Sequence, residues 1–315
     1  FMKKFLPILF FQVLLLLGKS GSASHLIGSE IRVNMTSATS GTITFIQYRD
    51  CSGITWCGCP PGPINSNCTY GLNLIGAIST CNNTSFGTIQ LPINVAAGVK
   101  DVFTYCSPAY KSYCTLCGTR TAGSFFPGAE VFTFSGPISL SNVPPGCSKV
   151  RITFQDCCRN SSITSLTNSA SLGFSSFIEF TPGLINSSPV FNSPPLFLVS
   201  PGIEVNYNLG ATDADGDSLS YRFGPAYTAN GVVAPYNSPY SATVPFPYLG
   251  APAQSPPAIP PLGISIDASN GDIRFTPVGN FKAPLIIEVL EWRKINGVMT
   301  NIGITRRELD MISNT

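Results

Sequence analysis

The sequence predicts an all-β protein built from two β-sandwich domains in tandem, of which the first is rich in disulfides. Three observations carry this prediction. The chain has 29 glycines, 27 prolines and only 11% charged residues, a composition typical of short strands joined by turns. Apolar and polar residues alternate at the period of a strand, and no stretch after the leader repeats at the helical period. All 11 cysteines lie between Cys51 and Cys158, so the chain has two unlike halves.

The chain opens with a sequence typical of a secretory signal peptide, residues 1–23. Two lysines precede an apolar run over residues 5–17, and small residues follow, ending with Ala23. A membrane-spanning helix takes ~20 apolar residues, more than this run supplies. We therefore expect an exported protein, secreted or at the cell surface, with no transmembrane segment.

Alternation marks the expected strands. Along residues 149–158, Val150, Ile152 and Phe154 fall on one face, as the two-residue period of a strand requires. The two adjacent cysteines that end this segment point to opposite faces, so we expect them to cross-link to different partners. The expected strands are residues 41–51, 149–158, 171–182 and 283–294.

The first domain, residues 24–185, contains every cysteine. In an exported chain, clustered cysteines are typical of disulfides. Zinc is the alternative, since two cysteine pairs have chelating spacing, but no second CxxC motif follows and the only histidine is His25. The odd count leaves one thiol free or paired with another chain, and the spacing leaves the connectivity open. The expected disulfide residues are Cys51, Cys57, Cys59, Cys68, Cys81, Cys106, Cys114, Cys117, Cys147, Cys157 and Cys158.

A proline-rich segment, residues 183–195, divides the two halves. Proline cannot donate to a β-ladder and favours extended backbone, so we expect a short stiff linker or an edge strand here. The second domain, residues 186–315, has no cysteine and depends on packing for its stability.

A long insertion interrupts the second domain at residues 223–266, where ten prolines and no charged side chain occur. One interpretation is a cover that lies flat over the sandwich and protects a sheet edge. The other is a recognition surface, because tyrosines on stiff extended backbone suit stacking on sugars or docking of a partner. The candidate ligand-binding residues are Tyr227, Tyr236, Tyr240 and Tyr248.

The segment ATDADGDSLSYRF, residues 211–223, is expected to be a strand end, a turn and a second strand. Asp213, Asp215 and Asp217 alternate through the turn, and carboxylates at this spacing can surround Ca²⁺. A helix–loop–helix calcium loop is excluded, because its sixth and twelfth positions would be a serine and a glycine here. The three aspartates are therefore either a calcium site of another kind or carboxylates that splay into water.

ATDADGDSLSY, ISIDASNGDIRFTP (264–277) and PLIIEVLEW together resemble the cadherin-like, dystroglycan-type immunoglobulin sandwiches of bacterial surface proteins. The segment NSSPVF, residues 186–191, stands where the cadherin inter-domain linker would be. The resemblance implies immunoglobulin/cadherin-like sandwiches, with Asp213 and Asp215 as cation ligands that face the preceding domain. Calcium is then the expected cofactor.

Several motifs along the chain also resemble, in the same order, large surface proteins of Bacteroidota. They are SHLIGSEI (24–31), YRDCSG (48–53), QDCCRNSSIT (155–164), SSPVFNSPP, DADGDSL and ITRRELDM (304–311). Those proteins are exported by the type IX secretion system and often end in a gliding-motility-associated sorting domain. The resemblance implies further domains of the same protein beyond residue 315.

Little in the sequence supports catalysis. His25, at the mature N-terminus, is a poor position for the general base of a catalytic triad. Asp50 and Asp156 each precede a cysteine on an expected strand, and if those strands are neighbours each aspartate could pair with Arg49 or Arg159. We expect such a pair to be structural rather than catalytic.

The charge balance argues against a nucleic-acid partner. Three of the 18 Lys and Arg leave with the leader, so 15 remain against 16 acidic residues. The sequence therefore predicts a non-catalytic, adhesin-like surface segment that acts in binding or as a structural spacer, rigidified by calcium. The alternative is a carbohydrate-binding accessory region of a secreted glycan-degrading enzyme.

Overall fold

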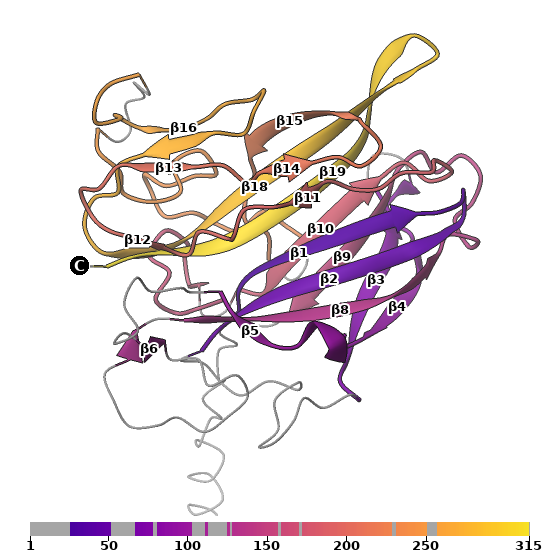
Figure 1. The fold of residues 1–315 in the computed structure, drawn as a ribbon, viewed down its shortest axis with the longest axis horizontal. Coiled ribbons are helices and arrows are strands. Elements are labelled where there is room, and N and C mark those ends of the chain that lie inside the picture. Colours follow the sequence, from indigo (N-terminus) through magenta and orange to yellow (C-terminus); the bar gives the residue numbers. More distant parts are fainter. Residues whose placement is uncertain are drawn as a thin grey trace, which may run out of the picture.

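The computed structural model describes residues 26–51, 67–77, 81–102, 111–112, 125–126, 128–156, 159–169, 172–228, 231–250 and 257–314. Over these residues the protein is all-β, as predicted, with a single 3-10 turn (Figure 1). The elements of the cysteine-rich half are β1 (Leu26–Met35), β2 (Ser40–Asp50), β3 (Thr69–Gly76), β4 (Ser85–Pro92), η1 (Val95–Ala97), β5 (Lys100–Asp101), β6 (Lys111–Ser112), β7 (Phe125–Phe126), β8 (Ala129–Ser139), β9 (Val150–Asp156) and β10 (Phe174–Phe180). Those of the second half are β11 (Val190–Phe191), β12 (Leu198–Val199), β13 (Val205–Tyr207), β14 (Ala211–Thr212), β15 (Ser218–Phe223), β16 (Ile264–Ile266), β17 (Ile273–Phe275), β18 (Phe281–Ile295) and β19 (Val298–Ser313).

The four strands expected from alternation are present as β2, β9, β10 and β18. In β9, Val150, Ile152 and Phe154 are fully buried, which confirms the predicted core face; on the other face Arg151 and Gln155 are not buried, whereas Thr153 is.

One large sheet forms the body of the molecule. Its strands follow the order β4-β3-β9-β10-β19-β1-β2-β8-β5, and β18 continues from β19 to β15. The sheet curls until its edges meet, because Ile93, just after β4, bridges to Phe134 of β8. The enclosed core is aromatic, with the rings of Phe45 and Phe154 4.6 Å apart.

A second core lies between the β15-β18-β19 part of this sheet and the small sheet β13-β17-β16. The rings of Phe246 and Phe281 stack with their centroids 4.8 Å apart, and the ring of Phe275 also packs against Phe246. Phe246 and Tyr248 come from the insertion, so part of that segment covers the second core.

The large sheet crosses the expected boundary at residue 185. Strand β19, from the second half, lies between β10 and β1 of the first half, with Ile178 opposite Thr305 and Gly28 opposite Leu309. Along its other edge, β19 pairs with β18 over nearly its full length. The division into two domains and their immunoglobulin/cadherin-like type stay predictions, but the hydrogen bonding of the two halves is continuous.

Buried ion pairs reinforce this junction. Arg307 of β19 donates to Glu30 of β1 at 2.8 Å, and both side chains are almost completely buried. On the opposite face of β19, Glu308 pairs with Arg159 at 2.6 Å. A third pair, Lys282 with Asp50 at 3.3 Å, joins the start of β18 to the end of β2.

Strands β1 and β19 are antiparallel neighbours, so β1 begins and β19 ends at the same end of the molecule. We call this the proximal end. The opposite, distal end carries the turn after β1, the loop between β8 and β9, the segment after β10, the aspartate turn before β15, and the tip of the β18–β19 hairpin (Figure 1). These distal loops are residues 36–39, 77–84, 140–149, 181–188, 213–217 and 293–300, of which 78–80 are outside the described residues.

Candidate functional site

The aspartate turn at the distal end is organised by its first carboxylate. Oδ1 of Asp213 accepts hydrogen bonds from the backbone N–H groups of Asp215 and Asp217, each at 2.9 Å. Gly216 adopts φ +80°, a conformation that favours glycine. The turn joins β14 to β15, as the sequence predicted, and its three carboxylates have oxygens within 4.8 Å of one another.

Arg293, close to the end of β18 and the tip of the β18–β19 hairpin, reaches into this turn. Its Nε and Nη2 atoms donate to the two oxygens of Asp217 at 2.7 and 2.6 Å, a bidentate geometry. Nη2 also lies 3.8 Å from Asp215. The side chain of Asp217 is only 4% exposed, so this pair is shielded from water on the carboxylate side.

The segment after β10 is anchored to the same group. Arg293 donates to the side-chain oxygen of Asn186 at 2.6 Å and to the backbone oxygen of Ile185 at 3.1 Å. The N–H of Ser187 donates to Asp215. The part of the predicted linker at residues 185–188 is thus fixed by the guanidinium and the aspartate turn together.

Glu291 of β18, two residues before Arg293, is the last member of this cluster of Asp213, Asp215, Asp217, Asn186 and Arg293. Its side chain is fully buried, and Oε1 accepts a hydrogen bond from Asn186 at 2.9 Å, whereas Oε2 has no hydrogen-bond partner. Burial and the nearby Asp213 and Asp217 carboxylates raise the pKa of Glu291 to about 8 against the opposing effects of Asn186 and Arg293. Burial likewise raises the pKa of Asp213.

The residues of the turn do not fit a calcium ion in this arrangement. Calcium takes six to eight oxygen ligands. Both oxygens of Asp217 are held by Arg293, one of Asp213 holds two backbone N–H groups, and one of Asp215 accepts from Ser187. Of the carboxylate oxygens in this cluster, Oδ2 of Asp213 and Oε2 of Glu291 are buried without a hydrogen-bond partner. A guanidinium already supplies positive charge at this place.

The four candidate tyrosines do not form one surface. Tyr248 is 3% exposed and packs in the second core, which argues against the predicted ligand-binding role. The hydroxyl of Tyr236 accepts from the N–H of Ala226 at 2.9 Å, and its ring packs against a buried cluster. Tyr240 is half-buried. These contacts favour the interpretation of the insertion as a cover.

Tyr227 is the tyrosine that borders a hollow. Its ring packs edge-on against Phe177 at 5.6 Å and lies over the guanidinium of Arg306 at 4.7 Å. The hollow beside it is also lined by the polar side chains of Asn83, Arg151 and Gln155.

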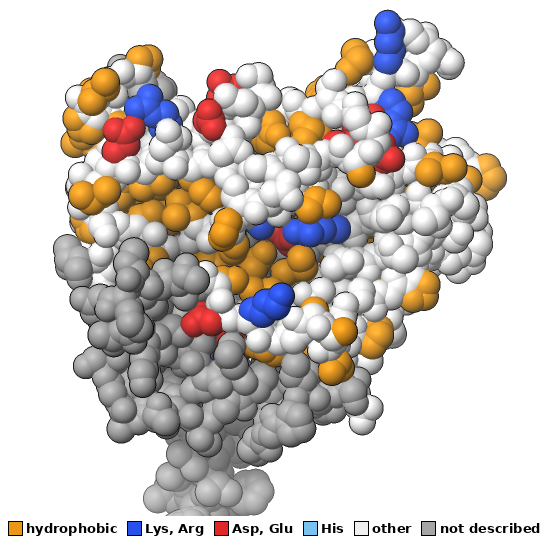
Figure 2. Space-filling view, viewed as in Figure 1, with side chains coloured by type: hydrophobic (Ala, Val, Ile, Leu, Met, Phe, Trp, Pro, Cys, Tyr) orange, Lys and Arg blue, Asp and Glu red, His pale blue; other side chains and the backbone are white. Residues whose placement is uncertain are grey.

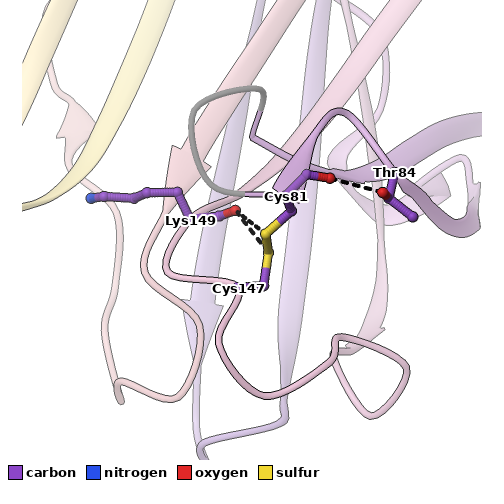
Figure 3. Close-up of a disulfide and its surroundings, with 4 residues drawn as sticks. All are labelled: Cys81, Thr84, Cys147 and Lys149. Atoms are coloured by element: carbon purple, nitrogen blue, oxygen red, sulfur yellow. Dashed lines mark hydrogen bonds between the residues drawn. A yellow bond between two sulfur atoms is a disulfide. The ribbon is translucent and has the colours of Figure 1, made fainter.

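One expected disulfide is seen in full at the distal end. Cys81 and Cys147 are bonded, with Cα atoms 5.6 Å apart, and join the loop after β3 to the loop before β9 (Figure 3). The backbone oxygen of Lys149 lies 3.2 Å from Sγ of Cys147. Cys51 and Cys68 each take part in a further disulfide. The remaining candidates, Cys57, Cys59, Cys106, Cys114, Cys117, Cys157 and Cys158, lie outside the described residues.

The suggested pairing of Asp50 and Asp156 with Arg49 or Arg159 is wrong. Strands β2 and β9 are not neighbours in the sheet, because β10, β19 and β1 lie between them. Arg49 instead pairs with Glu130 at 2.6 Å, and Asp156 accepts from the hydroxyl of Tyr70 at 2.6 Å. The arginines and aspartates do have structural partners, but from other strands.

The distal end also exposes apolar side chains. Val298 and Met299 at the hairpin tip are 66% and 51% exposed, and Ile185 is 62% exposed. The tip turns at Asn296-Gly297, both with positive φ, which is the signature of a tight hairpin turn. Next to the loop that carries Cys147 lies an open hollow of about 240 Å³, lined mainly by Leu140, Val143, Pro144, Pro145 and Pro182.

Charge is sparse on the face that Figure 2 displays. Acidic and basic side chains occur there as separate small groups, with apolar side chains exposed between them (Figure 2). This face therefore offers no continuous basic surface to a polyanion.

No protein-family model matches this chain, and no curated protein matches it either. Within the described residues, no helix combines the length and the apolar character that a membrane crossing requires. The fold and the distal cluster are therefore the basis for a functional proposal.

Proposed function

We propose that this chain is a non-catalytic segment of an exported surface protein, and that it acts by binding a partner through its distal end. The observation that carries the proposal is the position of the distal loops in the sheet. Since β1 begins and β19 ends at the proximal end, the distal loops lie at the opposite end of the molecule from these two strand ends. Loops gathered at one end of a rigid sheet are a common place for binding residues.

The chemistry of the distal end supports the same proposal. Exposed apolar side chains gathered at one end of a folded protein are typical of an interaction surface. Val298 and Met299 project on a hairpin arm beyond the last position where β15 supports β18, at Ser218 opposite Trp292. The arm and the open hollow near Cys147 supply a projecting and a recessed apolar feature at one end.

The distal loops are held in place at two points, which favours recognition by a preformed surface. The Cys81–Cys147 disulfide ties two of the loops together. The Arg293 cluster ties the segment after β10 to the aspartate turn and to the base of the arm.

The buried carboxylates support a structural rather than a catalytic use. Glu288 accepts from Arg306 at 2.6 Å and from Arg222 at 2.7 Å, and Glu30 and Glu308 each have an arginine partner. The side chains of these three glutamates are almost completely buried, so they are poorly placed to contact a substrate.

The alternative, glycan binding, is supported by one observation. Tyr227, a predicted ligand-binding residue, borders a hollow with Asn83, Arg151 and Gln155, and amide, guanidinium and aromatic groups together suit recognition of sugar hydroxyls and ring faces. That hollow is separate from the apolar arm.

Adhesion of coated beads tests the proposal. Beads carrying the protein through its N-terminus would be washed over cells and over mucin-coated glass, and a glycan array would be probed in parallel. The Val298→Ser/Met299→Ser variant is expected to lose most of the adhesion, and the matched control Ile203→Ser/Val278→Ser, whose side chains are 62% and 45% exposed elsewhere, is expected to keep it.

Equal adhesion by both variants would contradict a distal binding surface. Glycan binding that is abolished by Tyr227→Ala and unaffected by the arm variant would favour the alternative.

A further inference from the structure

We propose that Arg293 is the built-in cation of the aspartate turn and holds the position that a divalent metal would otherwise take. The turn has the carboxylate spacing of a metal site, and yet its strongest partner is a side chain of the same molecule. The inference concerns cation binding and stability at the junction, and it is independent of the proposed binding function.

The first support is geometric. Arg293 binds both oxygens of Asp217 and approaches Asp215, so it contacts two of the three aspartates that would share a metal. The fork of a guanidinium matches a carboxylate with two parallel N–H···O bonds, which the compact ammonium group of a lysine cannot reproduce. A metal ion at the centre of the carboxylates would have to displace these hydrogen bonds.

The second support is the pair of oxygens that remain. Oδ2 of Asp213 and Oε2 of Glu291 are buried without a hydrogen-bond partner, and Glu291 is completely buried. Unpartnered buried carboxylate oxygens mark a place where positive charge or a proton is favoured. Oε2 of Glu291 lies against Gly303 of β19, so the turn itself has one oxygen of Asp213 and one of Asp215 outside these hydrogen bonds, too few for calcium.

The third support is what Arg293 does for the linker. A metal site between two parts of a chain would crosslink them, and Arg293 makes that crosslink with hydrogen bonds. It joins Asp217 before β15, Asn186 after β10 and its own strand β18. The arginine thereby combines charge neutralisation with a mechanical connection.

Removal of the arginine is therefore expected to unmask a cation site. In Arg293→Gln, three aspartates would lie within 4.8 Å of one another with no counter-charge, and both oxygens of Asp217 would be free to bind an ion. A glutamine keeps polarity at the position but cannot neutralise the carboxylates.

The test compares the full chain with Arg293→Gln, Arg293→Lys and the control Arg274→Gln, whose arginine pairs with Glu204 in a more exposed position. Terbium luminescence and the melting temperature would be measured with and without 5 mM Ca²⁺, on the order of the weakest extracellular calcium sites. Circular dichroism would establish that each variant is folded.

The expected result has three parts. The wild type and Arg274→Gln show no calcium-dependent change in melting temperature, Arg293→Gln melts lower and recovers when Ca²⁺ is added, and its terbium signal rises at least tenfold above wild type. Arg293→Lys, which keeps the charge, shows no gain of terbium signal. If Arg293→Gln is unfolded without metal, its refolding on addition of Ca²⁺ is the expected outcome.

Two results would overturn the proposal. One is a wild-type protein that itself binds terbium and is stabilised by Ca²⁺ as strongly as the variant. The other is an Arg293→Gln protein that neither binds terbium nor responds to Ca²⁺.

Discussion

The ion pair between Arg307 and Glu30 gives the sharpest prediction about stability. Arg307 is 2% exposed and Glu30 fully buried, and their atoms are 2.8 Å apart. Arg307 also donates to the backbone oxygen of Ser193 at 3.0 Å and lies over the ring of Phe191. Glu30 keeps a second contact with Arg32, which is partly exposed. Because β1 and β19 come from the two halves, this pair tests whether the halves stabilise each other.

Arg307→Met retains an apolar side chain over Phe191 and removes the charge. Breaking one side of a buried ion pair costs about 3–5 kcal/mol, and Glu30 would keep only its partly exposed partner Arg32. One kcal/mol shifts the melting temperature of a chain of this size by about 2–4 °C, so we expect a decrease of about 6–20 °C.

A double-mutant cycle with Glu30→Gln isolates the pair. The two substitutions together are expected to cost less than the sum of the single ones, because the double variant leaves no unpaired buried charge. Urea unfolding at pH 7 measures the free energies, with Arg274→Met as the exposed control, expected to cost under about 1 kcal/mol. The reasoning is refuted if Arg307→Met costs no more than this control.

Two further predictions concern the distal end. Glu291 has its pKa raised to about 8 by burial, with Asp213 and Asp217 adding to the effect and Asn186, Arg293 and the nearby Lys149 facing it. A raised carboxyl pKa gives stability that is complete below the unfolded-state pKa and is lost as pH rises through 8. Glu291→Gln keeps the hydrogen bond from Asn186 and does not ionise. Its free energy of unfolding should therefore rise relative to that of the wild type by up to about 4 kcal/mol between pH 5 and pH 9. Urea unfolding at the two pH values measures this, and a pH-independent difference would contradict it. The Cys81→Ala/Cys147→Ala variant opens a loop with a sequence separation of 66, and we expect a loss of about 2–5 kcal/mol in calorimetry under non-reducing conditions. An unchanged melt would show that the disulfide is dispensable.

The sequence was sufficient for the fold class and for several strands, because period-two alternation depends only on local order. Val150, Ile152 and Phe154 face the core as predicted, and the turn at Gly216 joins two strands as expected. These features are set by neighbours close in the chain, and the alternation of side chains is therefore enough to reveal them.

The role of β19 could not be predicted in this way. Its sequence ITRRELDM contains four charged residues, which ordinarily indicate an exposed strand, and yet Arg306, Arg307, Glu308 and Asp310 are all buried. Arg307 and Glu308 have partners from distant segments, Glu30, which is 277 positions from Arg307, and Arg159. Burial of charge depends on such long-range pairs, and a single sequence does not show which strands become neighbours.

The candidate site was found in part. The aspartate spacing identified the turn, whereas Arg293 and Glu291 were missed because they lie about 75 residues further along the chain. The available signal was the pattern of β18, where Glu291 and Arg293 follow an apolar strand two positions apart and so point to the same face. The residues near β18 in the sequence, however, do not indicate that this face lies against the aspartate turn.

The central claim is that β19 makes the two halves one cooperative unit. Differential scanning calorimetry of the oxidised protein tests it most directly, by comparing the calorimetric with the van't Hoff enthalpy of unfolding. We predict one transition in which the two enthalpies agree. Two separable transitions, with Arg307→Met shifting only one of them, would contradict the account and favour independent domains on either side of residue 185.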